Sequence, residues 1–198
     1  MDFRTARSQD AEAIAALHAD SWRRTYRGMM PDAFLDGPVL ENRLEIWRAR
    51  LADGRTDPSV WLGVEHGQVV GFICVHADED SRWGSLIDNL HVRPESQQMG
   101  VGARLMGLAA DWLDDQCSGS PVYLWAMKAN HGARRFYERL GGRHVESLIK
   151  TDVAGGLALN CRYVWRAPAA IARVSKPNPA PDERGARHIE RPPHEGST

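Results

Sequence analysis

The chain has 198 residues, a formal net charge of −1 from 25 basic and 26 acidic side chains, and 42% hydrophobic residues. This length suffices for one domain with a sizeable core, and the balanced charge offers no overall positive field to nucleic acid or an anionic membrane. The three cysteines lack metal-ligand spacing and no apolar run approaches the roughly 20 residues of a membrane span, so we expect a cytoplasmic protein without disulfides, metal, nucleic-acid or membrane partners.

Two helices are predicted in the first fifty residues. Residues 8–10 supply a cap and an acidic first turn, after which Ile14, Leu17 and His18 fall on one helical face. Apolar residues then recur at helical spacing over residues 40–51, before Pro58.

Strands are predicted next. Residues 61–65 and 69–75 flank a short glycine turn and form a hairpin. Residues 86–92 largely alternate between apolar and polar side chains, and Pro94 forbids a continued ladder. We expect this segment to be the central strand.

The second half of the chain alternates helices and strands. A helical period follows residue 101, a strand covers 122–126, a helix covers 133–140, and strands lie around 151–152 and 157–165. A strand, a crossover helix and a further strand require a parallel pair, so the fold class is α/β (α+β) with a mixed sheet.

The composition changes after Arg166. Residues 167–198 contain six of the eleven prolines and few large apolar side chains, too few to offset the entropy of ordering them. We therefore predict one domain over residues 1–166 and a disordered tail over 167–198.

The junction between the central strand and the next helix contains Gly100 and Gly102. Glycines let the backbone approach a phosphate, and the free N–H groups of a first helical turn attract anions. Two glycines also occur in a merely tight connection, and both explanations stay open on these residues. A dinucleotide fingerprint would need glycine at Leu105, and a Walker A loop would need a lysine after Gly102.

Residues 90–102, in the pattern Leu-x-Val-x-Pro-x-x-Gln-x-x-Gly-x-Gly, resemble motif A of the GNAT superfamily of N-acetyltransferases, and residues 130–142 resemble its motif B. The resemblance covers residues 1 to about 165. It implies a central mixed sheet that splays open between its fourth and fifth strands, flanked by helices, with the pantetheine arm of acetyl-CoA in the gap. Two positions depart from the motifs, since Gln98 stands where many members have glycine and Gly142 replaces an aromatic residue.

The same resemblance implies which residues hold acetyl-CoA, the co-substrate. Backbone groups of the central strand and the turn, together with the start of the motif B helix, are expected to contact it. These residues are Leu90, His91, Val92, Gln97, Gln98, Met99, Gly100, Val101, Gly102, Ala103, Asn130, Ala133 and Phe136. Asn130 is also a good helix N-cap.

Acetyl transfer needs a neutral amine, an oxyanion donor and a proton for the departing thiolate. The resemblance assigns the proton to Tyr137 and the oxyanion donor to a backbone N–H near Val92. Some members carry a glutamate base where this chain has Leu86 or Trp125. Asp88 and His91 are the nearest titratable groups. Asp88 is expected to act as the base or to bind the substrate ammonium, whereas His91 is favoured as a structural residue.

Residues 21–32 are similar to the first-helix region of a bacterial subset that acetylates small amines. This implies that Trp22, Tyr26 and Met30 wall the acceptor pocket, although aromatic residues at helical spacing are more often core. The arginines among residues 23–27 would repel a polyamine unless Asp32, Asp36 or Asp88 lies closer to it.

The expected function is acetyl transfer from acetyl-CoA to a primary amine of a small molecule, directly within a ternary complex. The alternatives are a protein or peptide N-acetyltransferase and a non-catalytic acyl-CoA sensor. By analogy with the family, a homodimer that pairs through an edge strand at residues 157–165 is expected.

Overall fold

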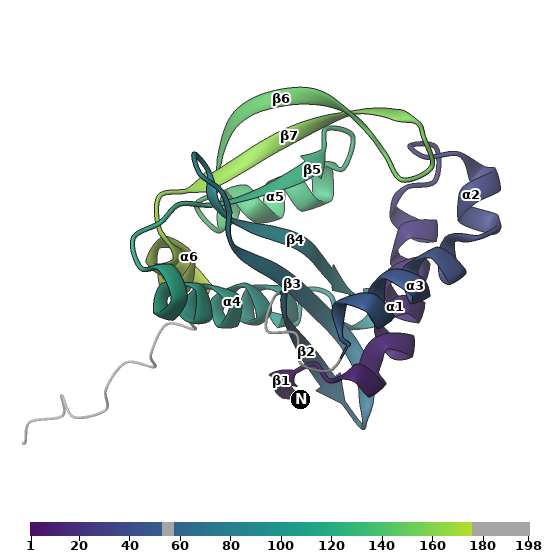
Figure 1. The fold of residues 1–198 in the computed structure, drawn as a ribbon, viewed down its shortest axis with the longest axis horizontal. Coiled ribbons are helices and arrows are strands. Elements are labelled where there is room, and N and C mark those ends of the chain that lie inside the picture. Colours follow the sequence, from purple (N-terminus) through teal and green to yellow (C-terminus); the bar gives the residue numbers. More distant parts are fainter. Residues whose placement is uncertain (53–57, 176–198) are drawn as a thin grey trace, which may run out of the picture.

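The computed structural model describes residues 1–52 and 58–175. At its centre is one seven-stranded sheet in the order β1-β2-β3-β4-β5-β7-β6, with helices packed against both faces (Figure 1). Neighbouring strands run antiparallel except β4 and β5, which are parallel. The predicted mixed sheet flanked by helices is confirmed.

The strands are β1 (Asp2–Thr5), β2 (Ser59–Glu65), β3 (Gln68–Asp80), β4 (Gly84–Val92), β5 (Val122–Met127), β6 (Arg143–Thr151) and β7 (Leu157–Trp165). The helices are α1 (Ala11–Thr25), α2 (Asp32–Asp36), α3 (Val39–Arg50), α4 (Val101–Cys117), α5 (His131–Arg139) and α6 (Pro168–Ser175), with short 3-10 turns at Ser8–Asp10 and Pro94–Ser96. No helix in the described ranges is both long and apolar enough to cross a membrane.

Strand β3 is apolar without alternation because helices cover both of its faces. Phe72 and Cys74 pack in a core with Trp47 of α3, whereas Ile73 and Val75 pack on the other face against α4. Successive strand side chains point to opposite faces, so burial on both sides yields a continuous apolar run. The layers thus place α1 and α3 on one side of the sheet and α4 on the other.

The predicted tail starts too early, because helix α6 follows the predicted boundary at residue 166. Helix α6 packs on α4, and its Ile171 is fully buried. The approach is possible because Gly107 of α4 has no side chain, and a Cβ there would lie 3.1 Å from Cβ of Ser175. Ile171, together with the partly buried Ala172, docks a segment whose composition predicts no core. Residues 176–198 of the predicted tail lie outside the described residues.

The topology also corrects the expected edge strand. Strand β7 lies between β5 and β6 and pairs with both, so β6 forms that edge of the sheet, and a second copy could not pair with residues 157–165. The structure also contains β1 and α2, which the apolar pattern did not predict. Both are too short to show a clear period.

Candidate functional site

The sheet opens between β4 and β5. These strands pair only where Ser85, Leu86 and Ile87 face residues 122–124. Beyond Ile87, β4 continues beside β3 while β5 continues beside β7 (Figure 1). The splay between the fourth and fifth strands is therefore present.

The open edge of β4 offers backbone groups to a ligand. The N–H of Arg93 donates to Val70 O on the β3 side at 2.8 Å. Because strand N–H groups alternate in direction, the N–H of Val92 faces the gap. Gln97 Nε2 donates to Val92 O at 3.1 Å, which ties the following turn to the end of the strand.

A β-bulge lies at the point of divergence. Cys74 pairs with Asn89 and Val75 pairs with Ile87, so Asp88 is the extra residue on β4. A bulge re-aims side chains and increases local twist. It directs Asp88 to the sheet face that carries Cys74 and His76, whose ligand atoms lie within 4.8 Å of its carboxylate.

The turn between β4 and α4 has the backbone that the two glycines predict. Gly100, the residue before α4, has φ +81°, and no side chain caps the helix. The first intrahelical donor is Arg104 N, which bonds Gly100 O at 2.9 Å, so the preceding first-turn N–H groups have no partner within the helix. A shallow pocket of about 170 Å³ adjoins this turn, between α1 and residues 92–97. This end of α4 fits an anion.

The two departures from the motifs have structural explanations. Gln98 has φ 63°, a left-handed conformation that costs a residue with a side chain roughly 1 kcal/mol and that glycine adopts freely. Gly142 cannot carry a side chain, because a Cβ would lie 2.7 Å from Cζ2 of Trp165. The Trp165 indole, whose Nε1 donates to Leu140 O at 2.7 Å, occupies that space.

Helix α5 brings the motif B residues to the same place. Asn130 is its N-cap, as predicted, and accepts from Ala133 N at 3.1 Å. Phe136 lies over the start of α4, since a Cβ on Gly102 would come 3.3 Å from its Cζ. The absence of a side chain at Gly102 thus permits α4 and α5 to meet.

Tyr137 lies among aromatic side chains beside the splay. Its ring centroid is 5.4 Å from that of Phe136 and 6.1 Å from that of Tyr163. Burial raises the pKa of the Tyr137 phenol well above its ordinary value, and the Tyr26 phenol raises it further. The hydroxyl is therefore protonated at neutral pH and can donate.

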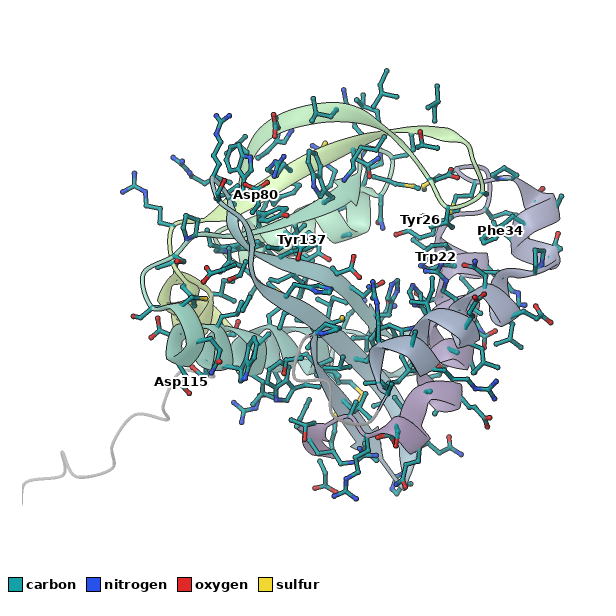
Figure 2. All side chains as sticks on the ribbon, viewed as in Figure 1. Trp22, Tyr26, Phe34, Asp80, Asp115 and Tyr137 are labelled. Carbon is teal, nitrogen blue, oxygen red and sulfur yellow. The ribbon has the colours of Figure 1, made fainter. Side chains whose placement is uncertain are left out.

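The C-terminal end of α1 lies next to the aromatic side chains around Tyr137. Burial raises the pKa of the Tyr26 phenol, and a hydrogen bond with the Asn130 side chain partly opposes that shift. Trp22 stacks edge-on against Tyr26 at 5.6 Å. Figure 2 labels Trp22 on α1, Tyr26 just after this helix, and Tyr137 across the diverging strands. Met30, in contrast, is only 5% exposed, so it packs inside this corner rather than forming an open wall.

The acidic residues of the α1–α2 region are already engaged. Arg27 bonds Asp36 at 2.7 Å and Asp32 at 3.0 Å. Both carboxylates are paired with the single Arg27, which cancels one of their two negative charges.

Comparison with known proteins settles the family. A family model described as the acetyltransferase (GNAT) family matches residues 14–142. The chain is 31% identical to a probable N-acetyltransferase of Mycobacterium tuberculosis over 140 residues, which cover 69% of this chain and 76% of the relative. The chain belongs to the GNAT acetyltransferase family. It is accordingly an N-acetyltransferase with acetyl-CoA as its co-substrate.

Two further comparisons agree with the family. An uncharacterized N-acetyltransferase of Bacillus subtilis is 28% identical over 131 residues, 64% of this GNAT chain and 72% of the relative. The crystal structure of the PaiA N-acetyltransferase from Thermoplasma acidophilum, in complex with coenzyme A, superposes with a TM-score of 0.62 at 15% identity, covering 80% of this chain and 96% of that one. At this identity the match shows the fold.

His91 of this GNAT domain has structural partners. Its Nδ1 lies 2.8 Å from Ser21 Oγ, and its ring centroid is 4.5 Å from that of His18. Burial lowers the pKa of His91 to about 4, with Asp88 opposing the shift and Arg43 adding to it. The imidazole is neutral at pH 7 and too weakly basic to deprotonate an ammonium group efficiently. The structural interpretation of His91 fits these contacts best.

The carboxylate of Asp88 is paired with a guanidinium. Arg50 of α3 lies 2.6 Å from Asp88 Oδ2 and 3.7 Å from Cys74 Sγ. The guanidinium thus supplies positive charge where Cys74, His76 and Asp88 approach one another. A substrate ammonium would share Asp88 with Arg50.

Sequence reasoning missed the cations around Asp88. Arg43 and Arg50 are seven residues apart on α3, so they lie on the same helical face, with Trp47 between them. Trp47 is fully buried. Two arginines at this spacing on an otherwise apolar helix face could have indicated a buried charged site. Nothing in the local sequence indicated that this face packs against the bulge of β4.

Proposed function

We propose that this enzyme transfers the acetyl group directly from acetyl-CoA to the primary amine of a small molecule, within a ternary complex at the splay between β4 and β5. The observation that carries the proposal is the convergence there of an open strand edge, an uncapped helix start and a buried phenol. Each group serves a different part of the reaction.

The uncapped first turn of α4 and the turn over residues 97–103 would bind the pyrophosphate of acetyl-CoA. Oriented N–H groups and the helix dipole favour phosphate charge at this end. The pantetheine arm would then lie along the open edge of β4 at residues 90–92, where a strand partner is missing, and reach Asn130, Ala133 and Phe136 of the α5 region.

The chemistry would take place next to the bulge. The amine nitrogen attacks the thioester carbonyl, and the resulting oxyanion accepts a hydrogen bond from the N–H of Val92, which faces the gap. As the carbon–sulfur bond breaks, Tyr137 donates its proton to the departing thiolate. Its buried phenol stays protonated until that step.

Asp88 is proposed as the acceptor-side carboxylate. It would bind the substrate ammonium or take its proton through water, while Arg50 holds the carboxylate in place at 2.6 Å. Trp22 and Tyr26 would form the apolar wall of the pocket. Tyr26 lies beside Asn130 and Tyr137, and Trp22 packs edge-on against Tyr26, which supports this role.

The test is release of free thiol from acetyl-CoA across amines and peptides, with mass-spectrometric detection of the acetylated product. We expect thiol release only when a small amine is present, and double-reciprocal plots that intersect, because both substrates must bind before reaction. Parallel plots with an acetylated enzyme would indicate a covalent intermediate instead. Reaction of peptides alone would favour the protein-acetylating alternative, and binding without turnover would favour a sensor.

A further inference from the structure

The bulge on β4 has more positive than negative charge around it. Arg50 pairs directly with Asp88. Asp88 also raises the pKa of Arg43, on α3, and of Lys150, on β6, so both cations lie within its electrostatic reach. The Asp88 carboxylate therefore lies near cations from two elements, α3 and β6.

Arg43 is buried without an anionic partner. Its side chain is 5% exposed. Among the described residues it hydrogen-bonds only Asn42 Oδ1, with Nε at 3.2 Å, and its guanidinium stacks 4.3 Å from the centroid of the Trp22 ring. Burial, and then Arg50, lower its pKa to about 10. An arginine that remains charged in such a place is costly unless something pairs with it.

Lys150 is a second cation near Asp88, and it forms no ion pair with the carboxylates described around the bulge. Its Nζ lies 4.3 Å from the centroid of Trp125. Arg162, on the strand beside it, stacks 4.2 Å from the same ring but is paired with Glu146 at 2.6 Å. The aromatic ring partly stabilises Lys150, as a cation–π contact does, yet leaves its charge available.

The acidic side chains nearby do not offset these cations. Asp88 pairs with Arg50 and Glu146 pairs with Arg162. Neither carboxylate forms an ion pair with Arg43 or Lys150 in the part of the chain that the structure describes. A bound anion would complete the arrangement, and a planar guanidinium matches a carboxylate with two parallel hydrogen bonds.

The position of Arg43 connects it to the acceptor rather than to acetyl-CoA. It stacks on Trp22, which we place in the acceptor wall, and influences His91 and Asp88 on the β4 face toward α1 and α3. The turn proposed to bind pyrophosphate is at the other end of this strand segment, after Val92.

We propose that the acceptor is a small amino acid, that is, an amine that also carries a carboxylate, and that Arg43 binds this carboxylate. This inference rests on the proposed function. The acetyl carbon forms its bond to the amine nitrogen and loses its bond to sulfur, while the carboxylate takes no part in the chemistry and only orients the amine toward the splay. Lys150, on β6, adds a second positive charge within electrostatic reach of Asp88.

The first experiment compares acceptors. Each amino acid is assayed beside its own carboxamide and its decarboxylated amine, with thiol release from acetyl-CoA as the readout. We expect at least one amino acid to exceed both analogues in kcat/KM by roughly 30-fold or more, the scale for losing one partner of a buried charge pair. Equal or faster turnover of every carboxamide would overturn the proposal.

The second experiment uses matched variants of α3. Arg43→Gln should raise KM for the amino acid and bring the ratio of acid to carboxamide close to one. Arg48→Gln removes the same charge from the same helix at an exposed residue paired with Glu12, and should leave that ratio unchanged. An unchanged ratio in Arg43→Gln would contradict carboxylate binding by Arg43.

The third experiment separates binding from folding. Because Arg43 is buried without a carboxylate, Arg43→Met should keep or raise Tm. A fall of several degrees in Arg43→Met would assign Arg43 to the fold and overturn the proposal. Acetyl-CoA should raise Tm equally in the wild type and in Arg43→Gln. If acetyl-CoA does not raise the Tm of the wild type, the proposed coenzyme site is wrong, and this outcome is separate from the role of Arg43.

Discussion

At the scale of single residues, burial determines the chemistry that each titratable group can perform. The environment of Tyr137 disfavours its phenolate, so the hydroxyl is an acid and not a base at neutral pH. The environment of His91 disfavours its cation. Tyr137 is thus suited to donate a proton, whereas His91 is left with a structural hydrogen bond to Ser21.

Tyr137→Phe should lower turnover by around 10²- to 10⁴-fold, the usual range for a positioned general acid. The dissociation constant for acetyl-CoA should stay nearly constant, because the hydroxyl acts only as the thiolate leaves. Tyr163→Phe is the matched control, since that phenol donates to Glu138 at 2.7 Å and should affect stability more than rate. An undiminished rate in Tyr137→Phe would point to water as the proton donor.

At the scale of elements, two positions at the start of α4 require glycine for different physical reasons. Gly100 needs its positive φ of 81°, and no atom lies within 4 Å of a Cβ built there. Gly102 has no such conformational demand but faces Phe136 at 3.3 Å. The first glycine therefore serves the backbone of the turn and the second serves the contact between α4 and α5.

Gly102→Val should abolish acetyl-CoA binding, because a branched side chain would press on Phe136 and obstruct the first turn. The measurement is the rise in stability on adding acetyl-CoA, which is about 2.7 kcal/mol for the wild type at 100 times the dissociation constant. The variant should remain folded and gain nothing. A folded variant that gains the full amount would place the pyrophosphate elsewhere. Gly100→Ala, in contrast, should show its effect first as lower stability of the free protein.

At the scale of the whole molecule, the domain extends past the last strand. Helix α6 returns to α4 and buries Ile171 against the face opposite α1 and α3 (Figure 1). Full burial of such a side chain contributes roughly 1.5–3 kcal/mol. The structural domain therefore includes residues 168–175.

Two truncations test this boundary. A chain that ends at residue 175 should keep the Tm of the full chain, because residues 176–198 contain a single large apolar residue, Ile189. A chain that ends at residue 166 should lose several degrees, since each kcal/mol shifts Tm by about 2–4 °C for a chain of this size. Thermal denaturation of both checks the result. Equal Tm values would show that α6 contributes nothing to stability.

The sequence by itself determined the local parts of this protein. The turn at residues 97–102, the N-cap Asn130, the continuous apolar run of β3 and the periodic run of α4 depend on neighbours a few positions away. Their patterns can therefore be recognised in the sequence. The resemblance of two such segments to motifs A and B led to the correct family and to the splay.

Only the tertiary structure decided what surrounds Asp88 and where the domain ends. Arg43 and Arg50 meet β4 because α3 packs across the sheet, Lys150 arrives from β6, and α6 docks where Gly107 leaves room. These neighbours are remote in sequence, and neither the hydrophobic periodicity nor the helix-capping residues predict their contacts. Burial and charge pairing arise from such non-local packing, and they determine which ionisable groups of the site remain free to bind a substrate.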